Sequence, residues 1–146
     1  MALLHDKKNC IGCAACQQAC QDYHGLPTGV KLMAITEREM LGRGNPVVFY
    51  EMKTCRQCVQ SACAAACPAQ AIWRGEDGVV RVRMELCRGC GACAEACPAG
   101  AVVLVYDASG SRALKCMECV GRSGGPVCVA ACPLSCIRIA AGEKVL

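Results

Sequence analysis

The chain has 146 residues, 17 of them cysteine, and a formal net charge of +4 at pH 7. Its N-terminal residues, MALLHDKKNC, lack the apolar segment and the small-residue cleavage site of a secretory signal. We therefore expect a cytoplasmic protein with reduced thiols rather than a disulfide scaffold, although a protein exported in folded form with a partner's signal would have the same sequence features. No apolar stretch reaches the roughly 20 residues that a membrane span requires.

The first cysteine run, CIGCAACQQAC over residues 10–20, separates its four cysteines by two, two and three residues. The alanine-rich end of this run predicts a short helix. The stretch that follows, VKLMAITEREMLGRGNPVVFYEMK over residues 30–53, predicts a long hairpin with its turn at residues 42–46. Several charged residues along this hairpin indicate that part of it is not core, and we expect that part to contact a partner.

The same order returns twice in the middle of the chain, as an internal repeat. The second run, residues 55–67, reads CRQCVQSACAAAC, and the third run, residues 87–97, reads CRGCGACAEAC. Each predicts a short helix around its last two cysteines. Each also precedes a predicted hairpin, the first over residues 71–84 with a turn at 75–78 and the second over 101–116 with a turn at 107–110.

The fourth run, residues 116–132, reads CMECVGRSGGPVCVAAC and has an enlarged gap before its third cysteine. All four runs open with C-x-x-C and close with C-x-x-x-C. Proline follows the last cysteine of the second, third and fourth runs, where it ends the helix and directs the chain toward a strand. The repeated unit of cysteine loop, short helix and hairpin predicts the α+β class and resembles the repeat of bacterial ferredoxins.

The spacing of the cysteines favours [4Fe–4S] clusters. In C-x2-C-x2-C-x3-C-P, three thiolates hold one cluster and the fourth ligates the cluster of a paired run, so four runs predict four clusters. Structural zinc needs two short cysteine pairs about 12 to 20 residues apart and has no use for the third and fourth cysteines of each run. An odd number of cysteines also disfavours a closed disulfide framework. A zinc-bound interaction module remains the alternative from another class.

Cluster loading changes the net charge of the protein. Sixteen thiolates and four oxidised cubane cores turn the formal charge of +4 into about −4. Lysine and arginine are scattered along the chain rather than grouped. We therefore expect no nucleic-acid partner.

Over nearly the whole chain, the four runs resemble the iron–sulfur electron-transfer subunits of the dimethyl-sulfoxide-reductase type of molybdenum and tungsten oxidoreductases. CIGCAACQQACQDYHGLPTGVK is similar to their first run, and KCMECVGRSGGPVCVAACP to their fourth. Related small subunits serve hydrogenases, formate dehydrogenases and tungsten aldehyde oxidoreductases. Ser61-Ala62 stands where the second run commonly has Pro-Pro, and the long insertions and C-terminal extension of larger members are not present, which favours a compact subunit.

The resemblance implies an α+β fold with two pseudo-symmetric ferredoxin-like lobes, each with two [4Fe–4S] clusters, short helices and β-hairpins. Runs one and four would form an outer lobe from residues 1–29 and 111–146. Runs two and three would form an inner lobe from residues 54–110. Residues 30–53 would connect the lobes and provide the partner-contact hairpin.

In that family the runs pair from the outside in, which implies four ligand sets whose clusters form one chain. The sets are Cys10, Cys13 and Cys16 with Cys132; Cys116, Cys119 and Cys128 with Cys20; Cys55, Cys58 and Cys63 with Cys97; and Cys87, Cys90 and Cys93 with Cys67. Cys136 is in register with Ala71 and Ala101, so we expect a buried thiol that is not a ligand.

The sequence contains no phosphate-binding glycine loop and no nucleophile with a paired base, so we expect no catalytic residues. The leading hypothesis is a relay of single electrons between a catalytic molybdenum or tungsten subunit, for example an aldehyde oxidoreductase, and an acceptor, a further redox subunit, or a ferredoxin or flavin module. A free polyferredoxin, or a hydrogenase or formate dehydrogenase relay subunit, is the alternative. End-to-end self-association would extend the chain of clusters.

Five further residues have open interpretations. His5 and His24 have no carboxylate or histidine partner in the pattern, so we expect surface or loop positions. Arg56, Arg88 and Lys115 lie in or beside ligand loops. Each would either offset the negative charge of a cluster and raise its reduction potential, or be solvated.

Overall fold

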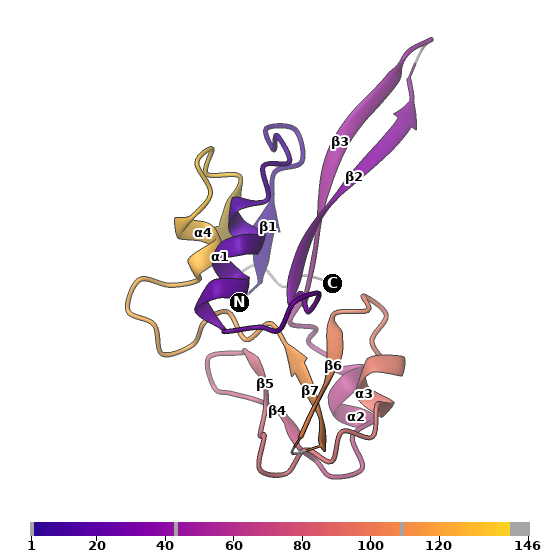
Figure 1. Ribbon diagram of the computed structural model, residues 1–146, viewed down its shortest axis with the longest axis vertical. Coiled ribbons are helices and arrows are strands. Elements are labelled where there is room, and N and C mark those ends of the chain that lie inside the picture. The colour runs from indigo at the N-terminus through magenta and orange to yellow at the C-terminus, as the bar shows by residue number, and fades with distance from the viewer. Residues whose placement is uncertain (1, 43, 109, 141–146) are drawn as a thin grey trace.

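The computed structural model describes residues 2–42, 44–108 and 110–140. Arg43 and Ser109 of the predicted turns, and Met1 and residues 141–146 of the predicted outer lobe, lie outside the described residues. The protein is a small mixed α/β structure of short helices and paired strands (Figure 1). In chain order its elements are β1 (Leu3–His5), α1 (Ala15–Tyr23), β2 (Met33–Leu41), β3 (Pro46–Thr54), α2 (Ala62–Ala65), β4 (Ile72–Arg74), β5 (Val80–Val82), α3 (Ala92–Glu95), β6 (Val102–Asp107), β7 (Gly110–Lys115), α4 (Val127–Ala130) and β8 (Ile137–Ile139).

The described strands form four antiparallel two-stranded sheets. Three of them, β2–β3, β4–β5 and β6–β7, join neighbouring strands and confirm the three predicted hairpins. In β6–β7 the register pairs Val102 with Lys115 and Leu104 with Ala113. Because side chains alternate along a strand, Ala113 and Lys115 share one face of β7, and both are buried.

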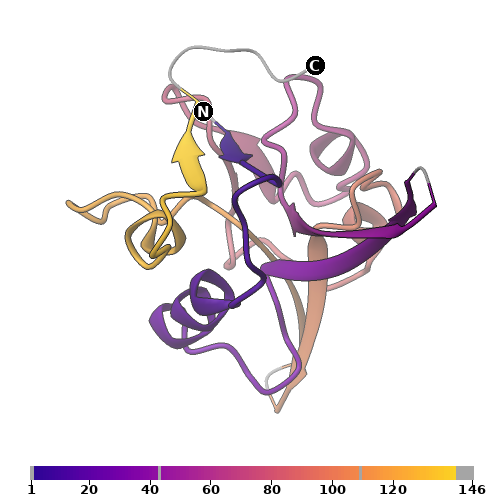
Figure 2. The ribbon, with the colours of Figure 1, turned by 90° about the horizontal axis from the view of Figure 1, so that it is seen from above.

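The fourth sheet pairs β1 with β8, which lie side by side in Figure 2. Its register runs from Leu3 opposite Ile139 to His5 opposite Ile137. The amide of Asp6 extends the pairing with a 2.8 Å hydrogen bond to the carbonyl oxygen of Cys136. The sequence pattern did not predict this sheet, because each strand has three residues and no turn joins them. It brings the start of the chain against the residues that follow the fourth run.

The short helices of the second, third and fourth runs end just before the proline that follows the last cysteine of each run. Pro68, Pro98 and Pro133 follow the last cysteines of three runs, and the helices of those runs have four residues each. Gln21 follows Cys20 instead, so α1 continues for nine residues. Within the part of the chain that the structure describes, no helix is long and apolar enough to cross a membrane.

Two groups of buried residues form the interior. One joins residues from both ends of the described chain, and half of its members are cysteines: Cys16, Cys20, Leu32, Met33, Cys119, Val127, Cys128 and Ile137. The other comes from the middle of the chain: Ile72, Val80, Cys93, Val102 and Ala113. Because cysteines occupy so much of the first group, a ligand bound by them would complete the packing of the interior.

The β2–β3 hairpin projects from the rest of the protein (Figure 1). Its strands are buried where they join the body, at Met33 and Thr54, and exposed toward the tip. Apolar side chains are nevertheless present near the tip, where Leu41 is 92% exposed and Met40 is 59% exposed. The structure thus presents an apolar tip on a two-stranded arm.

Candidate metal centres

The four cysteine loops share one backbone feature. In every run the residue before the second cysteine has a positive φ, which is 72° at Gly12, 51° at Gln57, 62° at Gly89 and 55° at Glu118. A left-handed residue bends the chain sharply, so each loop turns around the space beside its first two cysteines. Glycine adopts this conformation without steric cost, whereas Gln57 and Glu118 adopt it under a local strain that the surrounding structure must offset.

The last cysteines of runs two, three and four accept a hydrogen bond from the backbone amide four residues later. The proline that ends each helix turns the chain so that this amide points back at the sulfur. An amide donor stabilises the thiolate form of cysteine, which is the form that binds metal. The N···Sγ distances are 3.3 Å from Ala71 to Cys67, 3.3 Å from Ala101 to Cys97 and 3.2 Å from Cys136 to Cys132.

Cys136 thus has the position of two alanines in the other runs. Its side chain is buried, and its Sγ lies 3.7 Å from the carbonyl oxygen of Leu134. Burial, and then the neighbouring charge of Cys132, raise the pKa of the Cys136 thiol to about 11. These are the surroundings of an unreactive, packed thiol. That Cys136 is not a ligand stays a prediction.

The two runs in the middle of the chain enclose two small cavities. One is lined by Cys87, Cys90 and Cys93 of the third run together with Cys67, the last cysteine of the second. Ala113 lines the same cavity, and its amide donates to Cys87 Sγ at 3.4 Å. The structure therefore brings three cysteines of one run together with the last cysteine of another.

The second cavity has the reciprocal composition. Cys55, Cys58 and Cys63 of the second run line it together with Cys97, the last cysteine of the third. The two cavities are similar in size, about 350 and 360 Å³ with their open mouths included. Two cationic residues, Arg56 and Lys115, also line the second cavity. Lys115 is the more deeply buried of the two, at 2% exposure.

The first run meets the fourth run in the core that both ends of the chain form. Burial, and then the charges of Cys116, Cys119 and Cys16, raise the pKa of Cys20 to about 12. Burial and the charges of Cys116 and Cys20 likewise raise the pKa of Cys128 to about 12. Cys20 also belongs to one buried group with Cys119 and Cys128, so the last cysteine of the first run lies among cysteines of the fourth run.

Cys10 and Cys16 lie near the end of the fourth run. Burial raises the pKa of Cys16, and among neighbouring charges Cys132 contributes more than Cys13. The charge of Cys10 contributes to the raised pKa of Cys136, whose amide contacts Cys132. Cys13 itself is exposed, as is Cys90 of the third run.

Within the described residues, no three His, Cys, Asp or Glu side chains gather as ligands of a single metal ion. A cubane cluster has a different requirement, because each of its four thiolates binds a separate iron at a different corner. The two cysteine-lined cavities, the sulfur-directed amides and the thiol donors fit such a group. Iron would have to displace protons from thiols with pKa values as high as those of Cys20 and Cys128, so binding releases protons.

The expectation of a surface or loop position is wrong for His5, which lies in β1, whereas His24 lies in the turn that follows α1. His24 follows the last residue of α1 as its C-cap, is half-buried, and places its Nε2 3.5 Å from Cys119 Sγ. The ring nitrogens of His5 are buried without a hydrogen-bond partner among the described residues, and burial lowers the pKa of His5. The length of α1, which follows from Gln21 in place of proline, was the sequence signal that could have placed His24.

The three basic residues that flank the ligand loops differ in burial. Arg56 and Arg88 are exposed, whereas Lys115 is buried. Sequence reasoning also missed Gln57 and Glu118, which are both buried polar residues inside ligand loops. Glutamine and glutamate rarely adopt a left-handed backbone conformation, so only their alignment with Gly12 and Gly89 of the other two runs could have indicated it.

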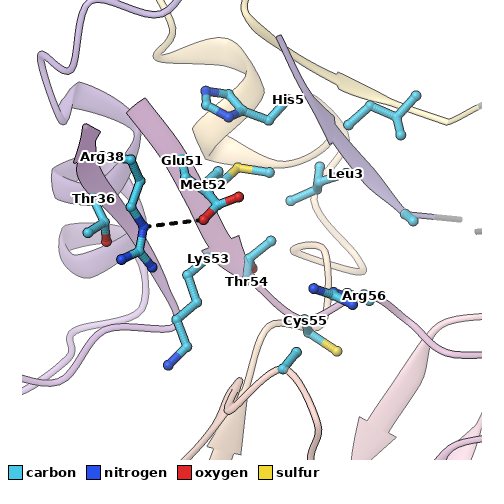
Figure 3. A pocket seen from close by; sticks show the side chains of 13 residues that line it. Leu3, His5, Thr36, Arg38, Glu51, Met52, Lys53, Thr54, Cys55 and Arg56 are labelled. Atoms are coloured by element: carbon cyan, nitrogen blue, oxygen red, sulfur yellow. Dashed lines mark ion pairs between the residues drawn. The ribbon is translucent and has the colours of Figure 1, made fainter. Parts of the chain in front are cut away.

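A larger pocket of about 1020 Å³, its open mouth included, lies beside Cys55, between β1 and the base of the β2–β3 hairpin (Figure 3). Lys53 and Arg56 line it, and Arg38 lies across it with Nε 3.4 Å from Glu51 Oε2. Cys55 is the cysteine in its lining, so this pocket is distinct from the two cavities that four cysteines surround. Among mostly uncharged residues, its lining includes the cationic side chains of Arg38, Lys53 and Arg56 and the carboxylate of Glu51.

Four repeated cysteine loops, amide donors aimed at sulfur and cavities bounded by paired runs define a ferredoxin-type iron–sulfur protein with four [4Fe–4S] clusters. Comparison with known families agrees. Residues 46–142 match the 4Fe-4S dicluster domain, and residues 7–23 match a 4Fe-4S binding domain.

Three relatives specify the family. The B subunit of anaerobic dimethyl sulfoxide reductase from Haemophilus influenzae is 36% identical over 92% of this chain and 71% of its own length. The B subunit of polysulfide reductase from Wolinella succinogenes is 33% identical over 90% and 71%. Thiosulfate reductase electron transfer subunit PhsB of Salmonella typhi is 31% identical over 93% and 73%. The chain belongs to this family of iron–sulfur electron-transfer proteins, the iron–sulfur subunits of molybdenum oxidoreductases.

Proposed function

We propose that this chain is the non-catalytic subunit of an oxidoreductase complex and that it relays single electrons to or from a molybdenum- or tungsten-containing catalytic subunit. The relatives named as reductase B subunits or as an electron transfer subunit support such a partner. The other end of the relay would meet an acceptor, a further redox subunit, or a ferredoxin or flavin module. A tungsten aldehyde oxidoreductase is one such complex, and hydrogenase and formate dehydrogenase complexes are others.

The observation that carries this proposal is the composition of the two cysteine-lined cavities, each made by three cysteines of one run and the last cysteine of another. It supports the four ligand sets implied by the family, with Cys67 and Cys97 exchanged between the middle runs and Cys20 and Cys132 exchanged between the outer runs. When bound, [4Fe–4S] clusters accept and donate single electrons without a change in their ligands. The cysteines of this chain would hold four of them at fixed separations.

The proximity of cysteines from different sets supports one row of four sites. The charge of Cys16 contributes to the raised pKa of Cys20, which indicates that the two outer sets are neighbours. The charge of Cys63 contributes to the raised pKa of Cys93, which indicates the same for the two inner sets. The charge of Cys55, after burial, contributes to the raised pKa of Cys116, which indicates that an inner set neighbours an outer set. The ends of this row are then the sets that contain the exposed thiols of Cys13 and Cys90, where electrons would enter and leave.

The two buried groups of residues support the division into lobes. Residues 1–29 and 111–146 would form the outer lobe, and residues 54–110 the inner lobe, although Leu32 and Met33 of the connecting segment also belong to the core of the outer one. We also propose a cytoplasmic location, because thiols must be reduced to bind metal and the cytoplasm keeps them reduced. Binding of one copy to another, end to end, would bring the exposed terminal sites together.

The connecting segment, residues 30–53, would contact the catalytic partner. It forms the projecting hairpin, whose tip exposes Met40, Leu41, Val47 and Val48. Apolar side chains exposed together on a projecting arm are characteristic of an interaction surface. The pocket at the base of the same hairpin lies beside Cys55 and would accommodate an acidic side chain of the partner next to Lys53 and Arg56.

Anaerobic purification of the tagged native chain, with metal analysis and identification of accompanying proteins, tests the proposal. We expect about 16 iron per chain, four for each cluster, together with a partner that contains molybdenum or tungsten. The same iron content without a partner would instead establish a free polyferredoxin. Zinc in place of iron would contradict both. A series of masses that grows with concentration would establish self-association, and a single mass at every concentration would exclude it.

A further inference from the structure

Lys115 is the last residue of β7 and the residue before Cys116. It is 2% exposed, and its Nζ donates hydrogen bonds to the carbonyl oxygens of Val80 at 2.5 Å and Cys116 at 2.9 Å. The position follows from the strand, since Ala113 and Lys115 share the buried face of β7. An ammonium group is therefore held in the interior, in a fixed place, by two backbone groups.

The place of this ammonium group is the junction between two of the four-cysteine sets. Lys115 lines the cavity of Cys55, Cys58, Cys63 and Cys97. Its backbone leads directly into Cys116, the first cysteine of the neighbouring set, to whose carbonyl oxygen its Nζ is bonded. The Lys115 side chain therefore lies beside cysteines of both sets.

A buried charge is costly unless an opposite charge lies nearby. The two hydrogen-bond acceptors of Lys115 are neutral carbonyls, so they orient the ammonium group without balancing its charge. Four thiolates and an oxidised cubane core carry a net negative charge, and each further electron adds to it. The buried carboxyl of Glu118, next to Cys119, lies within the range of the Lys115 charge. A cluster on each side of Lys115 would add a larger negative charge.

We propose that Lys115 is a positioning residue for electron transfer: its buried cation offsets the negative charge of the two clusters that meet at the junction of the inner and outer sets, and so raises their reduction potentials relative to the two terminal clusters. This inference rests on the proposed function, because it presumes the four ligand sets. It also separates Lys115 from Arg56 and Arg88, which have the same charge and flank ligand loops but are exposed to water, where their effect is screened.

The test compares Lys115→Met with Lys115→Arg in the full, iron-loaded chain. Lys31→Met, which removes an exposed lysine away from the cysteine runs, is the matched control. Iron content is measured first, and the four reduction potentials are then measured by titration with electron paramagnetic resonance. Cys97→Ser and Cys20→Ser, one variant for each junction set, assign the signals to their clusters.

In Lys115→Met we expect two of the four potentials to fall, each by about a tenfold change in the reduction equilibrium, which is about 59 mV for one electron. These two should be the clusters that Cys97→Ser and Cys20→Ser perturb, and Lys115→Arg and Lys31→Met should leave all four near their original values. Unchanged potentials, an equal fall in all four, or the same fall in Lys115→Arg would overturn the proposal.

Loss of iron in Lys115→Met is also decisive. If Lys115→Met loses only the two junction clusters while Lys115→Arg keeps all four, the positive charge is required at those sites, as proposed. If both variants lose iron alike, or if Lys115→Met loses all four clusters, Lys115 has a packing role and the proposal is wrong. Failure of the proposed function would look different, because the unmodified chain itself would then lack about 16 iron or would hold them without a molybdenum- or tungsten-containing partner.

Discussion

The side chain of Gln57 connects the loop of the second cysteine run to the start of the fourth run. Its Nε2 donates to the carbonyl oxygen of Cys116 at 3.0 Å, and its Oε1 accepts from the amide of Val80 at 2.9 Å. Gln57 is 5% exposed, so water cannot replace either bond. One amide side chain therefore satisfies two buried backbone groups at the same junction where Lys115 lies.

We expect Gln57→Leu to destabilise this junction. The substitution leaves the buried amide of Val80 without a partner, which costs about 1 to 3 kcal/mol, whereas the carbonyl oxygen of Cys116 keeps its hydrogen bond from Lys115 Nζ. Cluster absorbance should then disappear in guanidinium at a rate at least about fivefold higher than in the unmodified chain. Stopped-flow or manual-mixing measurements of visible absorbance provide the rate.

Gln60→Leu is the matched control, because Gln60 is exposed in the same loop region and the chemical change is identical. Its rate of cluster loss should equal that of the unmodified chain. Equal rates for Gln57→Leu and the unmodified chain would show that the two hydrogen bonds contribute nothing to the stability of the junction.

The exchange of the last cysteine between runs makes a second prediction. Cys20→Ser should alter the same cluster as Cys116→Ser, although these residues lie in different runs, because the proposed ligand sets assign both to one cluster and Cys20 packs in one buried group with Cys119 and Cys128. Electron paramagnetic resonance of the reduced variants should show one changed signal in each, and the changed signal should be the same. Cys132→Ser should change a different one.

Cys136→Ala is the control for these ligand variants. It removes the remaining cysteine and places alanine where Ala71 and Ala101 stand in the other runs. We expect all four signals and the full iron content to persist. A lost signal in Cys136→Ala, or different changed signals in Cys20→Ser and Cys116→Ser, would require another set of ligands.

The repeated units were predictable because their signals are local. Cysteine spacing within 11 to 17 residues, proline after Cys67, Cys97 and Cys132, and turn residues between apolar segments each act over a few neighbours. These signals predicted three hairpins and the ends of the short helices. The difference between α1 and the other helices also has a local cause, the residue after the last cysteine.

The positions of residues that depend on contacts between distant parts of the sequence could not be predicted. Strands β1 and β8 lie more than a hundred residues apart in sequence, and neither has a pattern long enough to identify it. Lys115 is charged and lies at a strand end, where exposure is usual, and its burial depends on carbonyls of Val80 and Cys116. The contact of His24 with Cys119 depends on the packing of α1 against α4.

His24 makes a third prediction possible. A cluster-bound Cys119 is a thiolate without a proton, so the 3.5 Å contact requires His24 Nε2 to donate. Hydrogen bonds to cluster sulfur raise the reduction potential. In His24→Phe, one of the four potentials should therefore fall by up to about 59 mV, a tenfold change for one electron.

The control for His24 is Tyr23→Phe, which keeps the aromatic ring that packs edge-on against His24 at a centroid distance of 4.9 Å. It should leave the four potentials unchanged. The affected cluster in His24→Phe should be the one assigned by Cys20→Ser. No change in any potential would mean that the imidazole does not donate to Cys119.

The hairpin tip makes the last prediction. Leu41 is 92% exposed and Val48 is 48% exposed, both far from the buried ends of their strands. If the tip binds the catalytic partner, a carboxylate there would be buried without a partner, and Leu41→Asp with Val48→Asp should weaken the complex at least about tenfold. Iron content should not change, because the cysteine runs lie outside the hairpin.

Tyr106→Asp is the matched control, since Tyr106 is 74% exposed at the end of another hairpin, β6–β7. Partner binding is measured by anaerobic pull-down and by titration of the purified subunits. If binding is weaker for the Leu41→Asp/Val48→Asp variant and unchanged for Tyr106→Asp, the partner surface is assigned to residues 30–53. Equal weakening by Tyr106→Asp would indicate a loss of solubility or a broad interface. Unchanged binding of the tip variant would exclude the tip as the partner surface, because a carboxylate that is buried without a partner must weaken binding.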